Sequence, residues 1–343
     1  MVSHEQLEQF LAQIRHPEKR TWILLVPNSL GETVVVCGLA QAFLKKHGHG
    51  ITLVIPESHA FIPQCFPNTF DRVVYMDLEL MRQFSTTGFI PPNFFNLDFP
   101  INTWIAQHGD GRIGSLYELW VESLGSAGLN FIDMNRYVLR LDWKAEFVAP
   151  RIPEDATRRA LDIAFGLGIK LKQSVVFFVG NNTNRPAPAF FWRKLAECYQ
   201  ARGMDVVINK YGAMLQPEEL AIPGARVIDL PLDIAVPFCE SAGHVVVGAN
   251  GFVVLALASR MDCEMNVLLS DEVCWDYRNF QYRKINPFNG CHQLGMPELS
   301  VGLENLREWL LRADCDNATL ETIANGIAFG TPNEFLIEAA PAA

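Results

Sequence analysis

The sequence predicts an α/β protein of two doubly wound domains, each a parallel sheet flanked by helices. The hydrophobic period switches repeatedly between strand-like and helix-like stretches, and this alternation occurs twice along the chain. A length of 343 residues with 49% hydrophobic content suffices for two cores. The proline-containing stretch 142–156 is the expected linker. We therefore expect domains over 1–150 and 151–330, with a disordered tail at 331–343.

The first half alternates in the order β-α-β-α-β, which is typical of a wound parallel sheet. Residues 82–100, rich in Phe, Pro, Asn and Thr, are expected to form a long irregular loop, and Leu116–Leu124 a helix. The expected regular elements before that loop are a strand at Trp22–Pro27, a helix at Val34–His47, a strand at Ile51–Ile55, a helix-like turn at Ala60–Cys65 and a strand at Arg72–Tyr75.

The second half repeats this architecture. Its expected strands are Ser174–Gly180, Asp205–Asn209, Ala225–Asp229, His244–Gly248 and Glu264–Leu269. Its expected helices are Glu154–Leu167, Pro188–Arg202, Leu232–Ala242 and Phe252–Ser259.

Composition narrows the function classes. A formal net charge of −10 argues against a general nucleic-acid binder, although a local basic patch for a phosphate-bearing ligand stays open. The start has no apolar signal-peptide core, and no run reaches the length of a membrane span. The eight cysteines form no C-x-x-C pair, which favours reduced thiols in a cytoplasm over a disulfide frame or a zinc site. We expect a cytoplasmic protein without a metal or other cofactor.

One short polar turn raises a functional question. Pro27–Thr33 joins the first strand to a helix and carries a single acid, Glu32. A carboxylate there is either a first-turn charge that suits the helix dipole or a base aimed into a ligand site. In doubly wound folds, ligands bind at the carboxyl ends of the strands. The loops 180–186 and 248–251 occupy that place in the second half.

These stretches resemble the glycosyltransferases of family nine, the group of the ADP-heptose:lipopolysaccharide heptosyltransferases. The family's N-terminal Ser-Leu-Gly-Asp-Val is matched by Ser29-Leu-Gly-Glu-Thr33. Its helix motif His-Trp-Arg-Glu-Leu is matched by Phe191-Trp-Arg-Lys-Leu195, and its Val-Asp-Thr-Gly-Leu-Ser-His-Leu by Gly248–Leu255. The resemblance covers most of the chain and implies the GT-B fold, in which two Rossmann-like domains face each other across a cleft.

The resemblance also implies an activity and its residues. A hydroxyl of the acceptor attacks the anomeric carbon of a nucleotide-diphosphate sugar, with inversion and without a required metal. Glu32 stands at the position of the family's catalytic Asp and becomes the expected general base. Arg185 replaces the phosphate-binding Lys and keeps a cation with a planar fork. Ala249 and Val254 replace the family's Asp and His, so two polar contacts to the donor are gone.

Further candidates surround these positions. One group is expected to contact the donor, and a second group is expected to contact the acceptor. Within the donor group, the start of a helix at Asn250 and Gly251 is the expected anion site. The donor group is Asn182, Thr183, Arg185, Lys210, Asn250 and Gly251; the acceptor group is Ser29, His108 and Arg112.

Each candidate has a plainer interpretation. Arg185 could be a solvated loop cation, Lys210 a surface charge, and His108 a residue of a connecting loop. Capping a helix is the commoner role of an Asn at the place of Asn250.

Two other functions stay open. One is another enzyme on this fold, such as a nucleotide-sugar epimerase; the other is a non-catalytic nucleotide-sugar-binding subunit. The expected partners are a nucleotide-diphosphate sugar and a hydroxyl-bearing glycan, protein or small molecule, without nucleic acid. Peripheral contact with the inner membrane is compatible with this function. The sequence does not reveal the donor sugar, the base, the acceptor or the oligomeric state.

Overall fold

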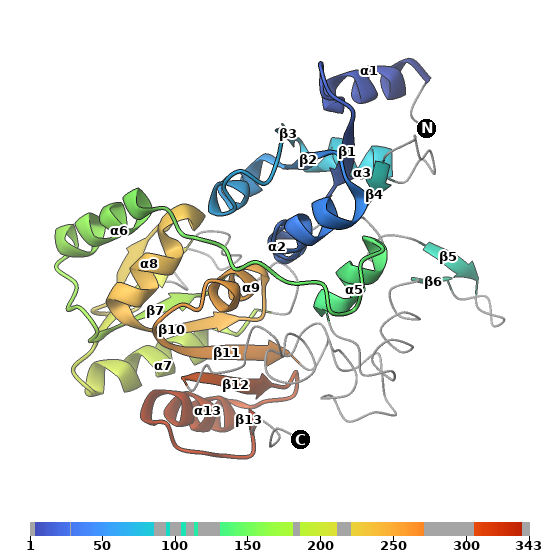
Figure 1. Ribbon diagram of the computed structural model, residues 1–343. Coiled ribbons are helices and arrows are strands. Elements are labelled where there is room, and N and C mark those ends of the chain that lie inside the picture. The colour runs from blue at the N-terminus through green and yellow to red at the C-terminus, as the bar shows by residue number, and fades with distance from the viewer. Residues whose placement is uncertain are drawn as a thin grey trace. The chain divides into compact units, whose positions relative to one another are not determined.

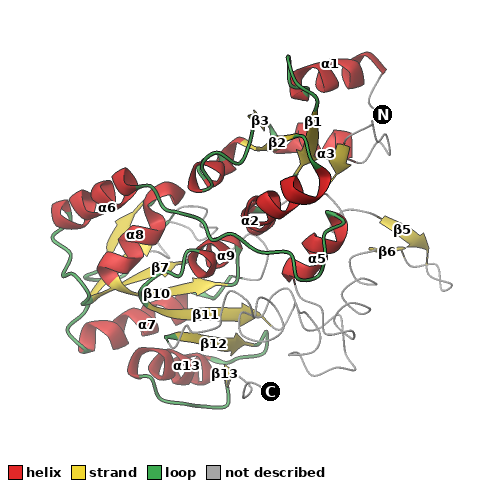
Figure 2. Cartoon of the chain, viewed as in Figure 1, coloured by secondary structure: helices red, strands yellow, loops and turns green. Residues whose placement is uncertain are grey.

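The computed structural model describes residues 4–27, 29–85, 94–96, 104–107, 113–115, 131–180, 186–210, 221–270 and 305–337 (Figure 1). The chain divides into two compact units, Met1–Arg151 (unit 1) and Ile152–Ala343 (unit 2). The division falls inside the expected linker 142–156. Each unit contains its own sheet and helices (Figure 2).

Unit 1 is built on a parallel sheet of four strands in the order β3-β2-β1-β4. Leu25 lies opposite Val54, so the carboxyl ends of β1 and β2 are neighbours. This adjacency places the segments that follow these two strands at the same edge of the sheet. The strands are β1 (Thr21–Leu25), β2 (Gly50–Pro56), β3 (Arg72–Met76) and β4 (Phe94–Asn96).

The helix α2 (Leu30–His47) leads away from β1 and is buried along most of its length. Its apolar residues lie on all sides, as expected for a helix that is enclosed by protein. The other helical elements described in unit 1 are α1 (His4–Ile14), the short 3₁₀ turns η1 (Glu57–His59) and η2 (Ile62–Cys65), α3 (Leu78–Ser85) and α5 (Phe131–Val138). The rings of Phe10 and Phe84 stack at 3.9 Å where α1 and α3 cover the sheet.

Two expectations for unit 1 need correction. The helix α2 begins at Leu30 rather than Val34, because Ser29 starts it and an acid suits its first turn. The prediction of an irregular loop over 82–100 is wrong for the two parts of it that the structure describes. The helix α3 runs to Ser85, and β4 is a strand that pairs with β1. β4 is a strand because it pairs with β1, and the sequence around β4 does not show this pairing.

Two further strands of unit 1 were not predicted. These are β5 (Trp104–Gln107) and β6 (Ile113–Ser115), which pair antiparallel. The predicted helix Leu116–Leu124 lies outside the described residues.

Unit 2 contains a sheet of seven strands in the order β13-β12-β11-β10-β7-β8-β9. From β7 the chain continues on one side to β8 and β9, and on the other side to β10, β11 and β12. The boundary between β7 and β10 is therefore the topological switch point, where ligands bind in doubly wound sheets. The strands are β7 (Ser174–Phe178), β8 (Asp205–Asn209), β9 (Arg226–Ile228), β10 (Gly243–Gly248), β11 (Glu264–Ser270), β12 (Leu306–Leu311) and β13 (Leu336–Ile337).

Helices cover both faces of this sheet. One core lies between the sheet and the neighbouring helices α7 (Ala189–Ala201) and α13 (Asn317–Phe329), with Phe177, Trp309 and Ile323 at its centre. Figure 1 shows α6 (Glu154–Gly166), α8 (Leu232–Ala242) and α9 (Gly251–Ala258) on the opposite face. The predicted strands and helices of unit 2 are confirmed, with small shifts at their ends.

The end of the chain differs from the expectation of a disordered tail over 331–343. Leu336 and Ile337 form β13, which pairs antiparallel with β12. Phe335 is buried against the core of the α7 and α13 face. This burial orders the segment although its composition is that of a frayed end, while residues 338–343 lie outside the described part.

Two observations concern membrane spans and cysteines. Within the described ranges, no helix is long and apolar enough to cross a membrane. Five cysteines in these ranges are free thiols: Cys37, Cys65, Cys198, Cys239 and Cys263.

Candidate functional site

The first candidate site is the start of α2 in unit 1. Val26 extends the pairing beyond β1 by donating its N–H to the Val54 carbonyl at 2.9 Å. Ser29 then adopts an extended conformation as the N-cap residue of α2. Its hydroxyl does not cap the helix but donates to the Glu32 carboxylate. The acid is therefore held at the first turn of the helix, just beyond the carboxyl end of β1.

Glu32 is buried, with 7% of its surface exposed. Burial raises its pKa, because the charged carboxylate loses water, while the hydrogen bond from Ser29 acts in the opposite direction. A carboxyl group with a raised pKa is a stronger proton acceptor once it is ionised. Such perturbed groups are more frequent at functional sites than elsewhere, so Glu32 is the strongest candidate base among the described residues of unit 1.

A histidine that could not be predicted from the sequence lies against Thr33, the residue that follows this acid. His59 is the last residue of η1, which follows β2, and its Nδ1 lies 2.9 Å from the Thr33 hydroxyl oxygen. Burial lowers the pKa of His59 to about 4, so the ring is neutral at neutral pH. The local sequence carries no signal for this contact, because it arises from the strand order: residues after two adjacent parallel strands meet at one edge of the sheet.

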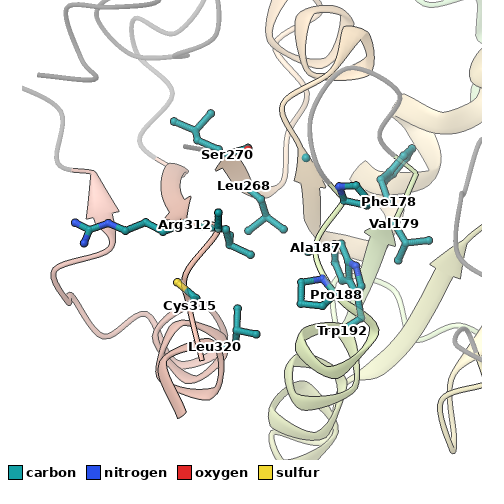
Figure 3. A pocket seen from close by; sticks show the side chains of 15 residues that line it. Phe178, Val179, Ala187, Pro188, Trp192, Leu268, Ser270, Arg312, Cys315 and Leu320 are labelled. Carbon is teal, nitrogen blue, oxygen red and sulfur yellow. The ribbon is translucent and has the colours of Figure 1, made fainter. Parts of the chain in front are cut away.

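The second candidate site is a cavity of about 220 Å³ in unit 2 (Figure 3). It lies at the carboxyl ends of the parallel strands and includes Phe178 at the end of β7 and Gly248 at the end of β10. It therefore lies at the topological switch point and extends toward β11 and β12. Helices also contribute to its lining, through Trp192 of α7 and Leu320 of α13.

The lining of this cavity is mostly apolar, with polar groups contributed by Ser270, Arg312 and Cys315. Trp192 adds an unusual feature. Only 2% of its surface is exposed, and its indole N–H has no hydrogen-bond partner in the described structure. Buried donors are normally paired, so an unpaired one beside a cavity is a candidate contact for a ligand.

The start of α9 was expected to bind an anion. The Asn250 side chain accepts hydrogen bonds from the N–H groups of Phe252 at 3.0 Å and Val253 at 3.4 Å, and therefore caps the helix. These two donors are thus occupied. Gly251 is the first residue of α9. Donor binding by Asn250 and Gly251 stays a prediction.

Of the remaining predicted residues, some lie within the described part of the chain and others outside it. Lys210 is exposed just beyond β8. Lys210, Asn250 and Gly251 are not among the residues that line the cavity. The structure brings Ser29 into contact with Glu32. The other candidates lie outside the described residues: Asn182, Thr183, Arg185, His108 and Arg112.

Comparisons with known proteins identify the fold. No family model and no curated protein sequence matches this chain. A family 9 glycosyltransferase from Veillonella parvula aligns over 92% of this chain and 99% of its own, with a TM-score of 0.53 and 11% identity. The ADP-heptose lipopolysaccharide heptosyltransferase II of Escherichia coli aligns over 91% of this chain and 99% of its own, with a TM-score of 0.53 and 10% identity.

The chain therefore has the GT-B fold class, which confirms the predicted fold of two doubly wound domains. Within that class it has the fold of the family nine glycosyltransferases, as the sequence resemblance implied. At this level of identity the likeness concerns the fold, and the chemistry has to be argued from the two sites.

Proposed function

We propose that this chain is a glycosyltransferase that moves a sugar from a nucleotide-diphosphate sugar to a hydroxyl group, with inversion, without a metal and with Glu32 as the general base. The observation that carries the proposal is the buried Glu32 carboxyl group at the start of α2, in a chain with the fold of heptosyltransferase II. In this proposal unit 1 receives the acceptor and unit 2 the donor.

The reaction requires a proton acceptor. The attacking hydroxyl oxygen forms a bond to the anomeric carbon and gives its proton to the Glu32 carboxylate. The bond between the anomeric carbon and the phosphate oxygen breaks, and its electron pair leaves with the nucleoside diphosphate. A positioned base typically contributes about 10²–10⁴ in rate. The raised pKa of the buried Glu32 supports this role.

The leaving diphosphate gains negative charge, which needs a stabilising group. Arg185 is proposed to supply a cation, and the start of α9 at Gly251 a backbone N–H group and the positive end of a helix dipole. Lys210, just beyond β8, follows the strand next to β7 and is proposed as a further contact. Asn182 and Thr183 belong to the same loop as Arg185 and complete the proposed donor group.

The cavity of unit 2 suits an uncharged part of the donor. Its walls are largely apolar, and the unpaired N–H of Trp192 would donate to an oxygen or ring nitrogen of the ligand. One solved structure with this fold is named for ADP-heptose, so ADP-heptose is the first donor to test. Ser29, His108 and Arg112 are proposed to contact the acceptor. A cytoplasmic location, where free thiols stay reduced, belongs to the same proposal.

The direct test incubates the full chain with ADP-heptose and with a panel of other nucleotide-diphosphate sugars, together with bacterial glycan extracts as acceptors. Release of the nucleoside diphosphate and a product heavier by one sugar in mass spectrometry would support transfer. Binding without any release would identify a non-catalytic binder. A rearranged free sugar would indicate an epimerase, and each of these two outcomes would refute the proposal.

Arg185 gives a separate prediction about the donor. Arg185→Ala should weaken binding of the preferred nucleoside diphosphate by about 1.5–3 kcal/mol, the usual value of a hydrogen bond to a charged group. Calorimetric titration measures this loss. The matched control is Arg193→Ala, which removes an exposed cation from α7. Equal affinities of the two variants would remove Arg185 from the donor site.

A further inference from the structure

The pair Thr33 and His59 has a hydrogen-bond arrangement that the proposed reaction does not yet use. Thr33 is fully buried, and His59 is 9% exposed. The Thr33 hydroxyl oxygen lies 2.9 Å from His59 Nδ1 and 3.5 Å from the Ser29 carbonyl oxygen. The backbone N–H of Thr33 donates to the same carbonyl at 3.3 Å.

A hydroxyl group has one hydrogen to donate and lone pairs to accept. The Ser29 carbonyl has no hydrogen, so the Thr33 hydroxyl donates to it. The contact with His59 then requires the ring to donate its Nδ1–H to the Thr33 oxygen. Both contacts are hydrogen bonds at the same time only with the neutral Nδ1–H tautomer of the imidazole, which is the form we infer.

Ser29 connects this pair to the acid. Its carbonyl receives both Thr33 donors, and its hydroxyl donates to the Glu32 carboxylate. The conformation of Ser29 therefore determines the position of the hydroxyl group that donates to Glu32. Ser29 is the N-cap residue of α2 and lies outside the regular hydrogen bonds of the helix interior.

We propose that His59 is a positioning residue for Glu32, acting through Thr33 and Ser29. His59 comes from the neighbouring strand connection, so it ties the segment after β2 to the first turn of α2. The catalytic part of this inference rests on the proposed role of Glu32 as the base. The positioning itself is a physical coupling between two side chains and can be measured without any substrate.

The experiment uses nuclear magnetic resonance on the full chain. Labelling the histidine rings with ¹⁵N reports the tautomer, and the His59 signal is assigned by its loss in His59→Asn. We expect the Nδ1–H form at pH 7. A ring protonated on Nε2 alone would reverse the donor and acceptor of the pair and overturn the inference.

The second measurement follows the ¹³C carboxyl signal of Glu32, assigned with Glu32→Gln. In His59→Asn, the side-chain amide occupies the place of Nδ1 and still donates to Thr33, so the Glu32 titration should stay as in the wild type. In His59→Leu the donor is lost. A looser Ser29 hydroxyl then stabilises the carboxylate less, and the pKa of Glu32 should move further upward.

A second pair of variants covers the case in which His59→Leu does not fold. Thr33→Ser keeps the hydroxyl and should leave the Glu32 titration unchanged, whereas Thr33→Val lacks it and should raise the pKa of Glu32. A role limited to packing predicts the same Glu32 titration in all folded variants, and that result would overturn the inference.

These outcomes separate the inference from the proposed function. If the chain transfers no sugar, the Glu32 titrations still decide whether His59 positions this carboxyl group. If transfer occurs and the titrations do not respond to His59 or Thr33, the positioning role fails while the glycosyltransferase proposal stands.

Discussion

The candidate sites of the two units differ in polarity and in how their buried polar groups are paired. In unit 1 the site is polar and buried, and Glu32, Thr33 and His59 each have a hydrogen-bond partner. In unit 2 the site is a mostly apolar cavity, and the buried N–H of Trp192 beside it has no partner in the described structure.

The difference indicates what each site is suited to. A polar cluster whose members are all paired holds a reactive group in one orientation, because moving any member leaves another unpaired. An unpaired buried donor lowers stability until a ligand supplies its acceptor. This contrast supports the proposal that Glu32 in unit 1 accepts a proton and that the cavity of unit 2 binds part of the donor.

The largest expected effect concerns the pH dependence of unit 1. The pKa of His59 is about 4 in the folded chain and 6.5 when exposed to water. The unfolded chain therefore binds a proton first as the pH falls, and the stability contributed by the neutral ring is lost between pH 6.5 and 4. The loss should reach about 3 kcal/mol near pH 4, since each unit of pKa difference corresponds to about 1.36 kcal/mol.

His59→Asn removes this titration, so its free energy of unfolding should fall less than that of the wild type between pH 7 and pH 4. Urea denaturation at several pH values measures both curves. Glu32 is present in both chains and acts in the opposite direction, because its raised pKa favours the folded state at low pH. Parallel curves for the two chains would contradict a buried neutral His59.

A smaller effect is expected from Thr33→Val. The valine has a similar shape but leaves the His59 Nδ1–H buried without an acceptor, which should cost about 1–3 kcal/mol of unfolding free energy. Thr33→Ser is the matched control, because it keeps the hydroxyl group. Urea denaturation at pH 7 compares the two. If both variants are equally stable, the Thr33 hydroxyl is not a required partner.

The smallest effect is expected in unit 2, at Tyr199. This side chain is fully buried, and its hydroxyl has no hydrogen-bond partner in the described structure. Tyr199→Phe removes the unpaired group and keeps the ring, so the free energy of unfolding should stay the same or rise by up to about 1 kcal/mol. A clear loss of stability in the same denaturation experiment would show that the hydroxyl is paired and would weaken the contrast between the units.

Regular elements with strong apolar patterns could be predicted from the sequence. The strand Asp205–Asn209 and the helix Leu232–Ala242 have the same bounds in the structure as in the prediction. Both consist mainly of apolar residues and are bounded by residues typical of turns, so the local pattern decides their conformation.

Strands that depend on a distant partner could not be predicted. The sequence of β12 contains Arg307 and Glu308, which do not fit the pattern of a buried strand. Arg307 forms an ion pair with Glu264 of the neighbouring β11 at 3.4 Å, a contact that only the folded sheet provides. The short β13 likewise exists through its pairing with β12.

In the candidate sites too, features of the local sequence could be predicted and contacts between distant segments could not. Glu32 could be found because it stands in a motif next to a predicted strand. His59 could not, because its partner Thr33 is 26 residues away and is reached through the pairing of β1 with β2. The sequence shows that Trp192 is present but not that its N–H lacks an acceptor.

The measurement that tests the proposed chemistry most directly compares Glu32→Gln with the wild type in the transfer assay. The variant should fold and bind the donor nucleotide nearly as well, while its turnover falls about 10²-fold or more, because it lacks the proton acceptor. The matched control, Glu57→Gln, neutralises an exposed acid of η1 and should keep full turnover. Wild-type turnover in Glu32→Gln would contradict the account and leave Glu32 as a charge at the start of a helix.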